Sequence, residues 1–263
     1  MTVHPGAYAS FVDDNAAPTC GPMNAYFQNT SLNAYAYAWD FGDGGLSNLV
    51  NPTHTYYNNN GYLDIYEVSL IAYNINGCND TTTNTLFVYP LMNLDFAITA
   101  SPGCAPLAVT MPYVTGVQNY QWDFGDGTTS SFAMPSHVFN NYTNSPQTYD
   151  VTLIGTSAFG CVDTATTQMI VYPNSVAQFS TSVISGCAPL QVDLTNLSIN
   201  ADSFTWNYGD GEVSQEAASL HGHLFVNNGS TPLVRTIALE TQNQFGCSSS
   251  FSTNIQIYPQ IEV

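Results

Sequence analysis

The sequence predicts an all-β protein that consists of three tandem immunoglobulin-like β-sandwiches in an elongated array. Three observations lead to this prediction. A block of sequence occurs three times, with its tryptophan at positions 39, 122 and 206. Each block contains short apolar or alternating runs between turn-forming residues, and almost no helical periodicity. Hydrophobic residues make up 44% of the 263 residues, which is enough to build a core in each block.

The first recurring element is a six-residue turn motif. It reads Trp-Asp-Phe-Gly-Asp-Gly at residues 39–44 and 122–127, and Trp-Asn-Tyr-Gly-Asp-Gly at 206–211. We expect the tryptophan to pack in the core and the glycines to supply positive φ. The Asp side chains should hold the turn by accepting hydrogen bonds from backbone N–H groups. The structural positions of the motif are Trp39, Asp40, Gly42, Asp43, Gly44, Trp122, Asp123, Gly125, Asp126, Gly127, Trp206, Gly209, Asp210 and Gly211.

One histidine follows each turn motif, at His54, His137 and His223. A catalytic or metal-binding histidine needs partners nearby, and a single periodic histidine beside an aromatic residue favours a structural hydrogen-bonding role. No catalytic residue set and no cofactor are expected. Calcium bound by paired aspartates of the turn motif is the disfavoured alternative, because Ca²⁺ needs six or more oxygens and the sequence has no Asp-x-Asp-x-Asp loop.

The ends of the blocks define the predicted domains. Each block closes with an apolar run and Tyr-Pro, at residues 89–90, 172–173 and 258–259. We therefore predict module 1 at residues 6–90, module 2 at 91–173 and module 3 at 174–259. Residues 1–5 match the closing segment of a block, so we expect the tail of a preceding module there. Residues 260–263 are expected to begin a following module or a linker.

Module 2 illustrates the strands expected in each block. Apolar or alternating runs predict strands at residues 94–98, 107–111, 119–124, 148–154 and 164–172. In the fourth run, Tyr149, Val151 and Leu153 alternate with polar positions and should face the core. Seven or so short strands with turns about every 8–12 residues are typical of an immunoglobulin-like sandwich.

The turn motif, a Pro-x-His-x-Tyr/Phe segment and a Tyr-x-Val-x-Leu strand together resemble the polycystic kidney disease (PKD) domain. The last two lie at residues 52–56 and 66–70 in module 1, and at 135–139 and 149–153 in module 2. Module 3 departs from the pattern at Asn207, at Tyr208 and in the missing proline before His223. The resemblance extends to repeat arrays of Bacteroidota surface proteins, including large gliding-type adhesins. It implies a non-catalytic extracellular role.

Six cysteines recur in register and predict disulfides in an oxidising compartment, which is extracellular or at the cell surface. In an immunoglobulin-like topology, the turn before the second strand and the hairpin before the last strand can share one end of the sandwich. We therefore predict one disulfide inside each module. Pairing between modules, or metal binding, is the disfavoured alternative. The predicted pairs are Cys20–Cys78, Cys104–Cys161 and Cys187–Cys247.

The charge balance limits the possible partners. The chain has a formal net charge of −18 and a single basic residue, Arg235. Nucleic acid and anionic membrane surfaces are therefore excluded as partners. No apolar run of 18 residues exists, so no direct membrane insertion is expected. The expected partners are other modules of the same chain and lateral copies of itself, with extracellular protein or polysaccharide as further candidates.

The sequence is compatible with two functions. The first is a structural or adhesive repeat segment of a large secreted or surface protein, acting as a rigid spacer or filament-forming unit. Short proline-containing joints favour it, because proline stiffens a link. The alternative is a carbohydrate- or protein-binding accessory region of a secreted hydrolase or protease. An exposed strip of tyrosines in module 1 would favour that alternative; the candidates are Tyr26, Tyr35, Tyr37, Tyr56, Tyr57 and Tyr62.

Overall fold

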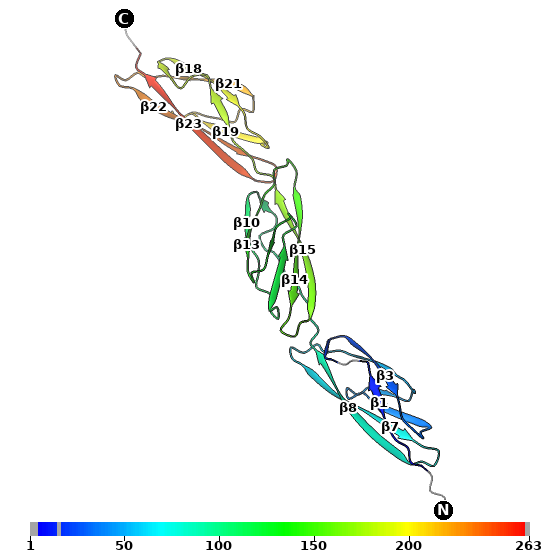
Figure 1. Ribbon diagram of the computed structural model, residues 1–263. Coiled ribbons are helices and arrows are strands. Elements are labelled where there is room, and N and C mark those ends of the chain that lie inside the picture. The colour runs from blue at the N-terminus through cyan, green and yellow to red at the C-terminus, as the bar shows by residue number, and fades with distance from the viewer. Residues whose placement is uncertain (1–4, 15–16, 261–263) are drawn as a thin grey trace, which may run out of the picture.

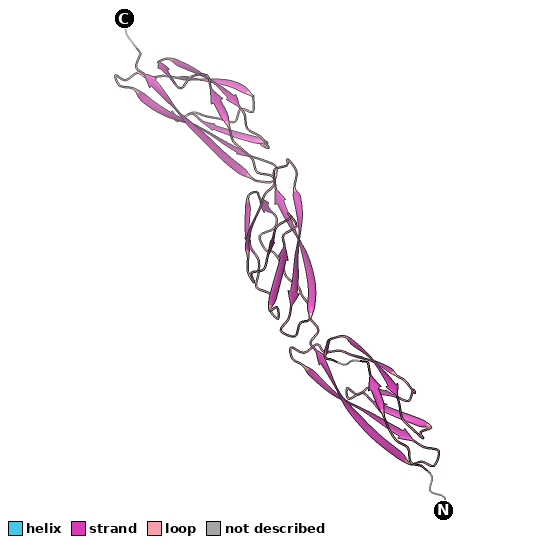
Figure 2. Cartoon of the chain, in the orientation of Figure 1, coloured by secondary structure: helices cyan, strands magenta, loops and turns pink. Residues whose placement is uncertain are grey.

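The computed structural model describes residues 5–14 and 17–260. Three β-sandwiches lie end to end and form a rod, with the two termini at opposite ends (Figure 1). The described residues contain strands and loops but no helix (Figure 2). None of them therefore belongs to a helix that could cross a membrane. The predicted neighbouring-module segments at 1–5 and 260–263 fall mostly outside the described residues, because 1–4 and 261–263 are not among them.

Each module packs a small sheet against a five-stranded sheet. In module 1 these sheets have the strand orders β1-β3-β6 and β2-β8-β7-β4-β5. The strands of module 1 are β1 (Phe11–Asp13), β2 (Thr19–Cys20), β3 (Met23–Asn29), β4 (Ala36–Asp40), β5 (Leu46–Ser47), β6 (Thr53–Tyr56), β7 (Asp64–Tyr73) and β8 (Asn79–Tyr89).

Modules 2 and 3 repeat this plan, with the sheet orders β10-β13 and β12-β11-β14-β15-β9, and β16-β18-β21 and β17-β23-β22-β19-β20. The strands of module 2 are β9 (Gly103–Cys104), β10 (Leu107–Thr110), β11 (Asn119–Asp123), β12 (Thr129–Ser130), β13 (Ser136–Phe139), β14 (Gln147–Thr156) and β15 (Val162–Tyr172). Those of module 3 are β16 (Phe179–Thr181), β17 (Ser185–Cys187), β18 (Leu190–Asn196), β19 (Ser203–Asn207), β20 (Val213–Ser214), β21 (Leu220–Phe225), β22 (Leu233–Gln242) and β23 (Ser248–Tyr258).

The first strand predicted for module 2, residues 94–98, is not formed. This segment runs as irregular backbone, whereas β1 and β16 occupy the equivalent place in the other modules. The segment is nevertheless held by specific contacts. The Leu94 N–H donates to the Asp163 carboxylate at 2.7 Å, and the Phe96 ring packs edge-on against Trp122 at 5.0 Å. Side-chain packing and one side-chain acceptor therefore replace a ladder of backbone bonds.

Each module has its own hydrophobic core around the tryptophan of its turn motif. Trp122 is fully buried, and the alternating residues Tyr149, Val151 and Leu153 on β14 face it from the neighbouring strand, as predicted. Trp39 and Trp206 occupy the same position in separate core clusters. The three modules are thus independently packed units, and what joins them must lie at their ends.

Every module has two distinct ends, which we call the head and the tail. The head carries the hairpin between the two longest strands, at residues 74–78, 157–161 and 243–247. The tail is the opposite end, where the last strand stops at Tyr89, Tyr172 or Tyr258. A short strand pairs there in parallel with the last strand, so that Cys20 lies opposite Tyr89, Cys104 opposite Tyr172 and Cys187 opposite Tyr258.

Candidate functional site

The predicted turn-and-histidine motif forms the same cluster in each module. The imidazole of His54 lies flat against the Phe41 ring, with centroids 4.2 Å apart, and edge-on to Tyr56. Its Nε2 lies 2.7 Å from the Asp43 carboxylate. Because a carboxylate can only accept, Nε2 carries the hydrogen and donates it. His137 and His223 make the equivalent 2.7 Å bonds to Asp126 and Asp210, and stack on Phe124 and Tyr208.

The carboxylates of this cluster hold the turn, as the sequence predicted. The first Asp of the motif accepts a hydrogen bond from the backbone N–H of the glycine two residues later. In module 1 this is the 2.9 Å bond from Gly42 to Asp40. Asp123 does the same for Gly125. In module 3 the side-chain oxygen of Asn207 accepts from Gly209 at 2.9 Å. The Asn substitution therefore keeps the turn bond, because only one acceptor oxygen is needed.

The hydrogen bond from each motif histidine shifts the pKa of its aspartate partner. Burial opposes the charge on Asp43, but the hydrogen bonds from His54 and the Gly45 N–H outweigh it, so the pKa of Asp43 lies below its ordinary value of 3.8. The same balance lowers the pKa of Asp126 and Asp210. The three carboxylates therefore stay ionised over the whole physiological range.

The paired aspartates do not converge with other ligands. Within residues 5–14 and 17–260, no group of three or more His, Cys, Asp and Glu side chains lies close enough to hold a metal ion. Both carboxylate oxygens of Asp43 already accept hydrogen bonds, one from Gly45 and one from His54. The geometry of the motif is that of a structural turn cluster.

A further repeated residue was missed in the sequence. Asn58, Asn141 and Asn227 are buried, and each follows the motif histidine by four positions. The Asn58 amide donates to the carbonyls of Tyr62 and Val88, and its oxygen accepts the Asn60 N–H. One side chain thus ties the loop after β6 to the last strand near the tail. The constant spacing from the histidine was a signal that could have identified it.

The joints between modules carry the contacts that determine the shape of the molecule. At joint 1, the Tyr89 ring from the tail of module 1 stacks on Phe159 from the head of module 2, with centroids 5.0 Å apart. At joint 2, Tyr172 stacks on Phe245 at 4.8 Å. The aromatic residue before Gly-Cys in the head hairpin was the sequence signal for this pair, and it was not used.

The disulfides lie across these joints, which overturns the predicted pairing inside each module. Cys20 is bonded to Cys161, and Cys104 to Cys247, with Cα atoms 5.8 and 5.7 Å apart. Cys78 and Cys187 are free and exposed. The predicted pairs Cys20–Cys78, Cys104–Cys161 and Cys187–Cys247 are therefore wrong.

The physical reason is the length of the last strand. Cys20 lies opposite Tyr89 at the tail, whereas Cys78 precedes β8 at the head. The eleven residues of β8 separate the two cysteines, and at about 3.3 Å per residue they span roughly 36 Å. A disulfide requires Cα atoms within about 7 Å. The head cysteine of the next module meets that requirement because the modules stack end to end.

The tyrosines of module 1 do not line up as a single strip. Tyr56 is fully buried in the core. Tyr35 is 76% exposed, and its backbone N–H donates a hydrogen bond to the Tyr73 carbonyl near the head. Tyr57 and Tyr62 are exposed in the loop that Asn58 anchors near the tail. Tyr26 is 41% exposed on β3, and Tyr37 is partly buried against the core. The exposed rings are thus spread over separate elements of the module.

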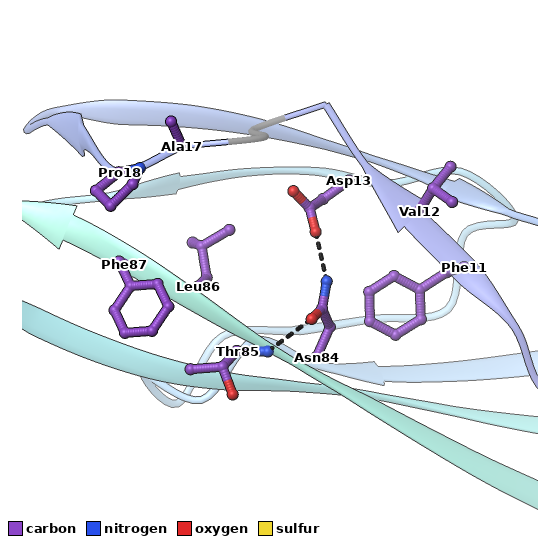
Figure 3. A pocket seen from close by; sticks show the side chains of 9 residues that line it. All are labelled: Phe11, Val12, Asp13, Ala17, Pro18, Asn84, Thr85, Leu86 and Phe87. Carbon is purple, nitrogen blue, oxygen red and sulfur yellow. Dashed lines mark hydrogen bonds between the residues drawn. The ribbon is translucent and has the colours of Figure 1, made fainter.

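A shallow groove of about 530 Å³ opens in module 1 between β1 and β8. Figure 3 shows Asp13 and Asn84 facing each other across it, joined by a hydrogen bond of 2.6 Å. Phe11 and Phe87 form its apolar part. Modules 2 and 3 have Ile98 and Thr181 in place of Asp13, so the bond between Asp13 and Asn84 is not a repeated feature of the array.

Comparison with known proteins identifies one matching family. A family model described as "PKD domain" matches residues 3–88 and 107–171, which is more than half of the chain. The PKD1 domain of Vibrio anguillarum Epp is 27% identical over 33% of this chain and 96% of that domain, with a TM-score of 0.28. The PKD1 domain from the Vibrio cholerae metalloprotease PrtV is 28% identical over 32% of this chain and 99% of that domain, with a TM-score of 0.27.

A three-domain segment of titin, I67–I69 in an E-to-A variant, covers 99% of this chain and 100% of its own length at 10% identity, with a TM-score of 0.48. By fold and by its joints, the molecule is a tandem array of immunoglobulin-like β-sandwich modules. The chain belongs to the PKD domain family. PKD and immunoglobulin-like domains are generally non-catalytic modules. Family membership and the two disulfides together point to an extracellular location.

Proposed function

We propose that this chain is a rigid spacer segment of a large secreted or cell-surface protein, with a structural role in adhesion or surface motility. The observation that carries this proposal is the clamp at both joints, where a disulfide and a stacked aromatic pair connect the tail of one module to the head of the next. Two attachments besides the peptide link restrain bending and twisting of neighbouring modules.

The linkers themselves have little slack. Pro173 is buried, and its carbonyl accepts a 2.8 Å bond from the Asn243 amide in the head hairpin of module 3. At joint 1, the Leu91 N–H donates to the Asn58 carbonyl in module 1 at 2.7 Å. Proline removes rotation about φ, and these bonds fix the neighbouring backbone. A clamped linker of this kind suits a rod that holds another part of a protein at a distance.

The rigidity can be tested by small-angle X-ray scattering on the oxidised chain. The variant that carries Cys20→Ser and Cys161→Ser should show a broader distance distribution than wild type, because joint 1 can then hinge. The variant that carries Cys78→Ser and Cys187→Ser is the matched control and should scatter like wild type. Module stability should change little, with melting shifts below the roughly 4–8 °C that about 1 kcal/mol produces in a domain of this size.

Two outcomes would count against the proposal. A compact particle for the oxidised wild type would exclude a spacer. Identical scattering from the joint 1 variant and wild type would show that the disulfide does not stiffen the rod. The location and size of the native product can be checked by electron microscopy of the surface protein, where a long beaded molecule is expected.

The accessory role beside a secreted hydrolase or protease is the second proposal that the sequence raised. The exposed tyrosines on which it depended lie on separate elements of module 1. Within the described part of module 1, these tyrosines therefore do not form one face of stacked rings for a polysaccharide. The spacer proposal rests on contacts that recur at both joints, so we place it first.

A further inference from the structure

The two free cysteines are the unpaired halves of the clamp that closes both internal joints. Cys187 lies at the tail of module 3, opposite Tyr258, in the position that Cys20 and Cys104 hold opposite Tyr89 and Tyr172. The following residue also makes the same bond in all three modules, with the N–H of Gly21, Ala105 or Ala188 donating to the carbonyl of that tyrosine at 2.9–3.0 Å.

Cys78 stands in the same backbone geometry as the two bonded head cysteines. Its N–H donates to the Asn74 side chain at 3.0 Å, just as the Cys247 N–H donates to Asn243 at 3.0 Å. The preceding Gly77 and Gly246 both adopt positive φ, at 80° and 82°. Both free cysteines are therefore presented in the conformation that forms a disulfide at the internal joints.

The difference between free and bonded cysteines lies in what covers them. Cys161 and Cys247 are 2% and 1% exposed, because a neighbouring tail covers each of them. Cys78 and Cys187 are exposed. Tyr258, the counterpart of the stacked Tyr89 and Tyr172, is likewise 40% exposed and has no ring against it among the described residues. Each end of the array thus shows an uncovered cysteine at a position that is buried or bonded at the joints.

We infer that each end of the array is a docking face for another PKD module that carries the complementary cysteine. Cys187 would bond to a head cysteine of a following module, and Cys78 to a tail cysteine of a preceding module. The argument is continuity with the two joints already formed, and an exposed unpaired thiol in an oxidising compartment is typical of a residue that pairs beyond its own domain. The inference holds whether or not the array acts in adhesion.

The bond would form by thiol–disulfide exchange with a small-molecule disulfide such as glutathione disulfide. One cysteine thiolate attacks the disulfide and releases a glutathione thiol, and the second cysteine thiolate displaces the other glutathione from the mixed disulfide. Two cysteine thiols are oxidised, and one glutathione disulfide is reduced to two thiols. The chain itself contains both halves, so it can serve as its own partner.

A tandem fusion tests the inference with the linker register intact. Residues 1–259 of one copy are followed directly by residues 6–263 of a second, so that Pro259 precedes Gly6 as Pro5 does in the native chain. After equilibration with glutathione disulfide and acid quenching, alkylation should detect two free thiols per fusion. Peptic peptide mapping should find Cys187 of the first copy bonded to Cys78 of the second.

Folding is monitored in the same digest, because the Cys20–Cys161 and Cys104–Cys247 peptides report that the joints inside each copy have formed. Four alkylated thiols in molecules that contain those peptides would overturn the inference. Links between separate fusions in place of the internal link would also overturn it. Cys187→Ser in the first copy is the matched control and should leave three free thiols.

A second variant separates a specific joint from chance oxidation of exposed thiols. Asn76 holds the head position that Phe159 and Phe245 hold at the internal joints. Asn76→Phe in the second copy should restore a stacked pair with Tyr258 and raise the disulfide-forming equilibrium constant against glutathione by about threefold to tenfold. An unchanged constant would show that the thiols meet without the joint geometry.

Discussion

At the scale of single residues, the turn motif depends on two glycines that both have positive φ but differ in how crowded they are. Gly125 has a φ of +76°, and a Cβ there would lie 2.7 Å from the Asp150 carbonyl oxygen. Gly127 has a φ of +90°, but a Cβ there would meet nothing within 4 Å. Both glycines supply the left-handed conformation, and only Gly125 also allows two strands to approach closely.

This difference predicts unequal costs for alanine at the two positions. Gly127→Ala should lower the free energy of unfolding of module 2 by about 1–2 kcal/mol, the cost of a left-handed alanine. Gly125→Ala should cost clearly more, because the β11–β12 turn must also move away from β14. Hydrogen exchange of module 2 peptides against denaturant measures both. Equal losses in the two variants would contradict this interpretation.

The carboxylate of each turn predicts a dependence of stability on pH. Because the pKa of Asp43 in the folded chain lies below 3.8, its contribution is present above the unfolded pKa of about 3.9 and is lost as the pH falls through the folded pKa. Asp43→Asn should therefore lower the melting temperature at neutral pH, and its difference from wild type should shrink below pH 3.8. A constant difference across this range would show that the ionised bond to His54 contributes nothing specific.

At the scale of elements, one missing proline changes a strand. Pro52 and Pro135 precede β6 and β13, which have four residues each. His221 occupies the equivalent position in module 3, and β21 is six residues long because the backbone there keeps its N–H. The same change places an imidazole edge-on against Trp206, and its two buried ring nitrogens have no hydrogen-bond partner among the described residues. The longer strand is thus gained together with an unsatisfied polar group.

His221 should make module 3 sensitive to mild acid. Burial lowers the pKa of His221 below its ordinary value of 6.5, although nearby Glu216 partly opposes the shift. The unfolded chain therefore binds more protons, and the free energy of unfolding falls as the pH drops below about 6.5. His221→Leu should remove this dependence and stabilise module 3 by about 1–3 kcal/mol, the cost of an unsatisfied buried polar group.

Hydrogen exchange of module 3 peptides between neutral and mildly acidic pH measures the effect of His221. Peptides of modules 1 and 2 in the same sample are the control, because those modules have proline at this position. Parallel pH profiles for wild type and His221→Leu would contradict the role given to the imidazole.

At the scale of the whole molecule, composition and topology act together. The chain has one basic residue, Arg235, and it lies inside β22 with its guanidinium donating to the Gly209 carbonyl at 2.9 Å. Trypsin therefore has a single cleavage site, and the paired strand protects it. We expect native chain to resist trypsin, and unfolded chain to be cut into 1–235 and 236–263, which separate only after reduction because the Cys104–Cys247 disulfide joins them. Cleavage of the native chain at the rate of the unfolded one would show that module 3 opens readily.

The sequence by itself determined the class of fold, the three modules and the residues of the turn cluster. Those features depend on local patterns: alternation along strands, glycines at turns and a motif repeated in register. The roles of Trp122, Asp123 and His137 followed from such patterns and are confirmed by their contacts. The four predicted module 2 strands from β10 onward also formed with ends within two residues of the structure.

Only the tertiary structure decided which cysteines meet. Spacing along the chain suggested one pair in each module, but the length of β8 places Cys20 and Cys78 at opposite ends of module 1. The stacking of modules then brings Cys20 to Cys161, which is 141 residues away in sequence. The spacing of cysteines in a repeated sequence is the same whether the disulfides form within each module or between neighbouring modules. The choice depends on distances between module ends, and these exist only once the modules are folded and joined.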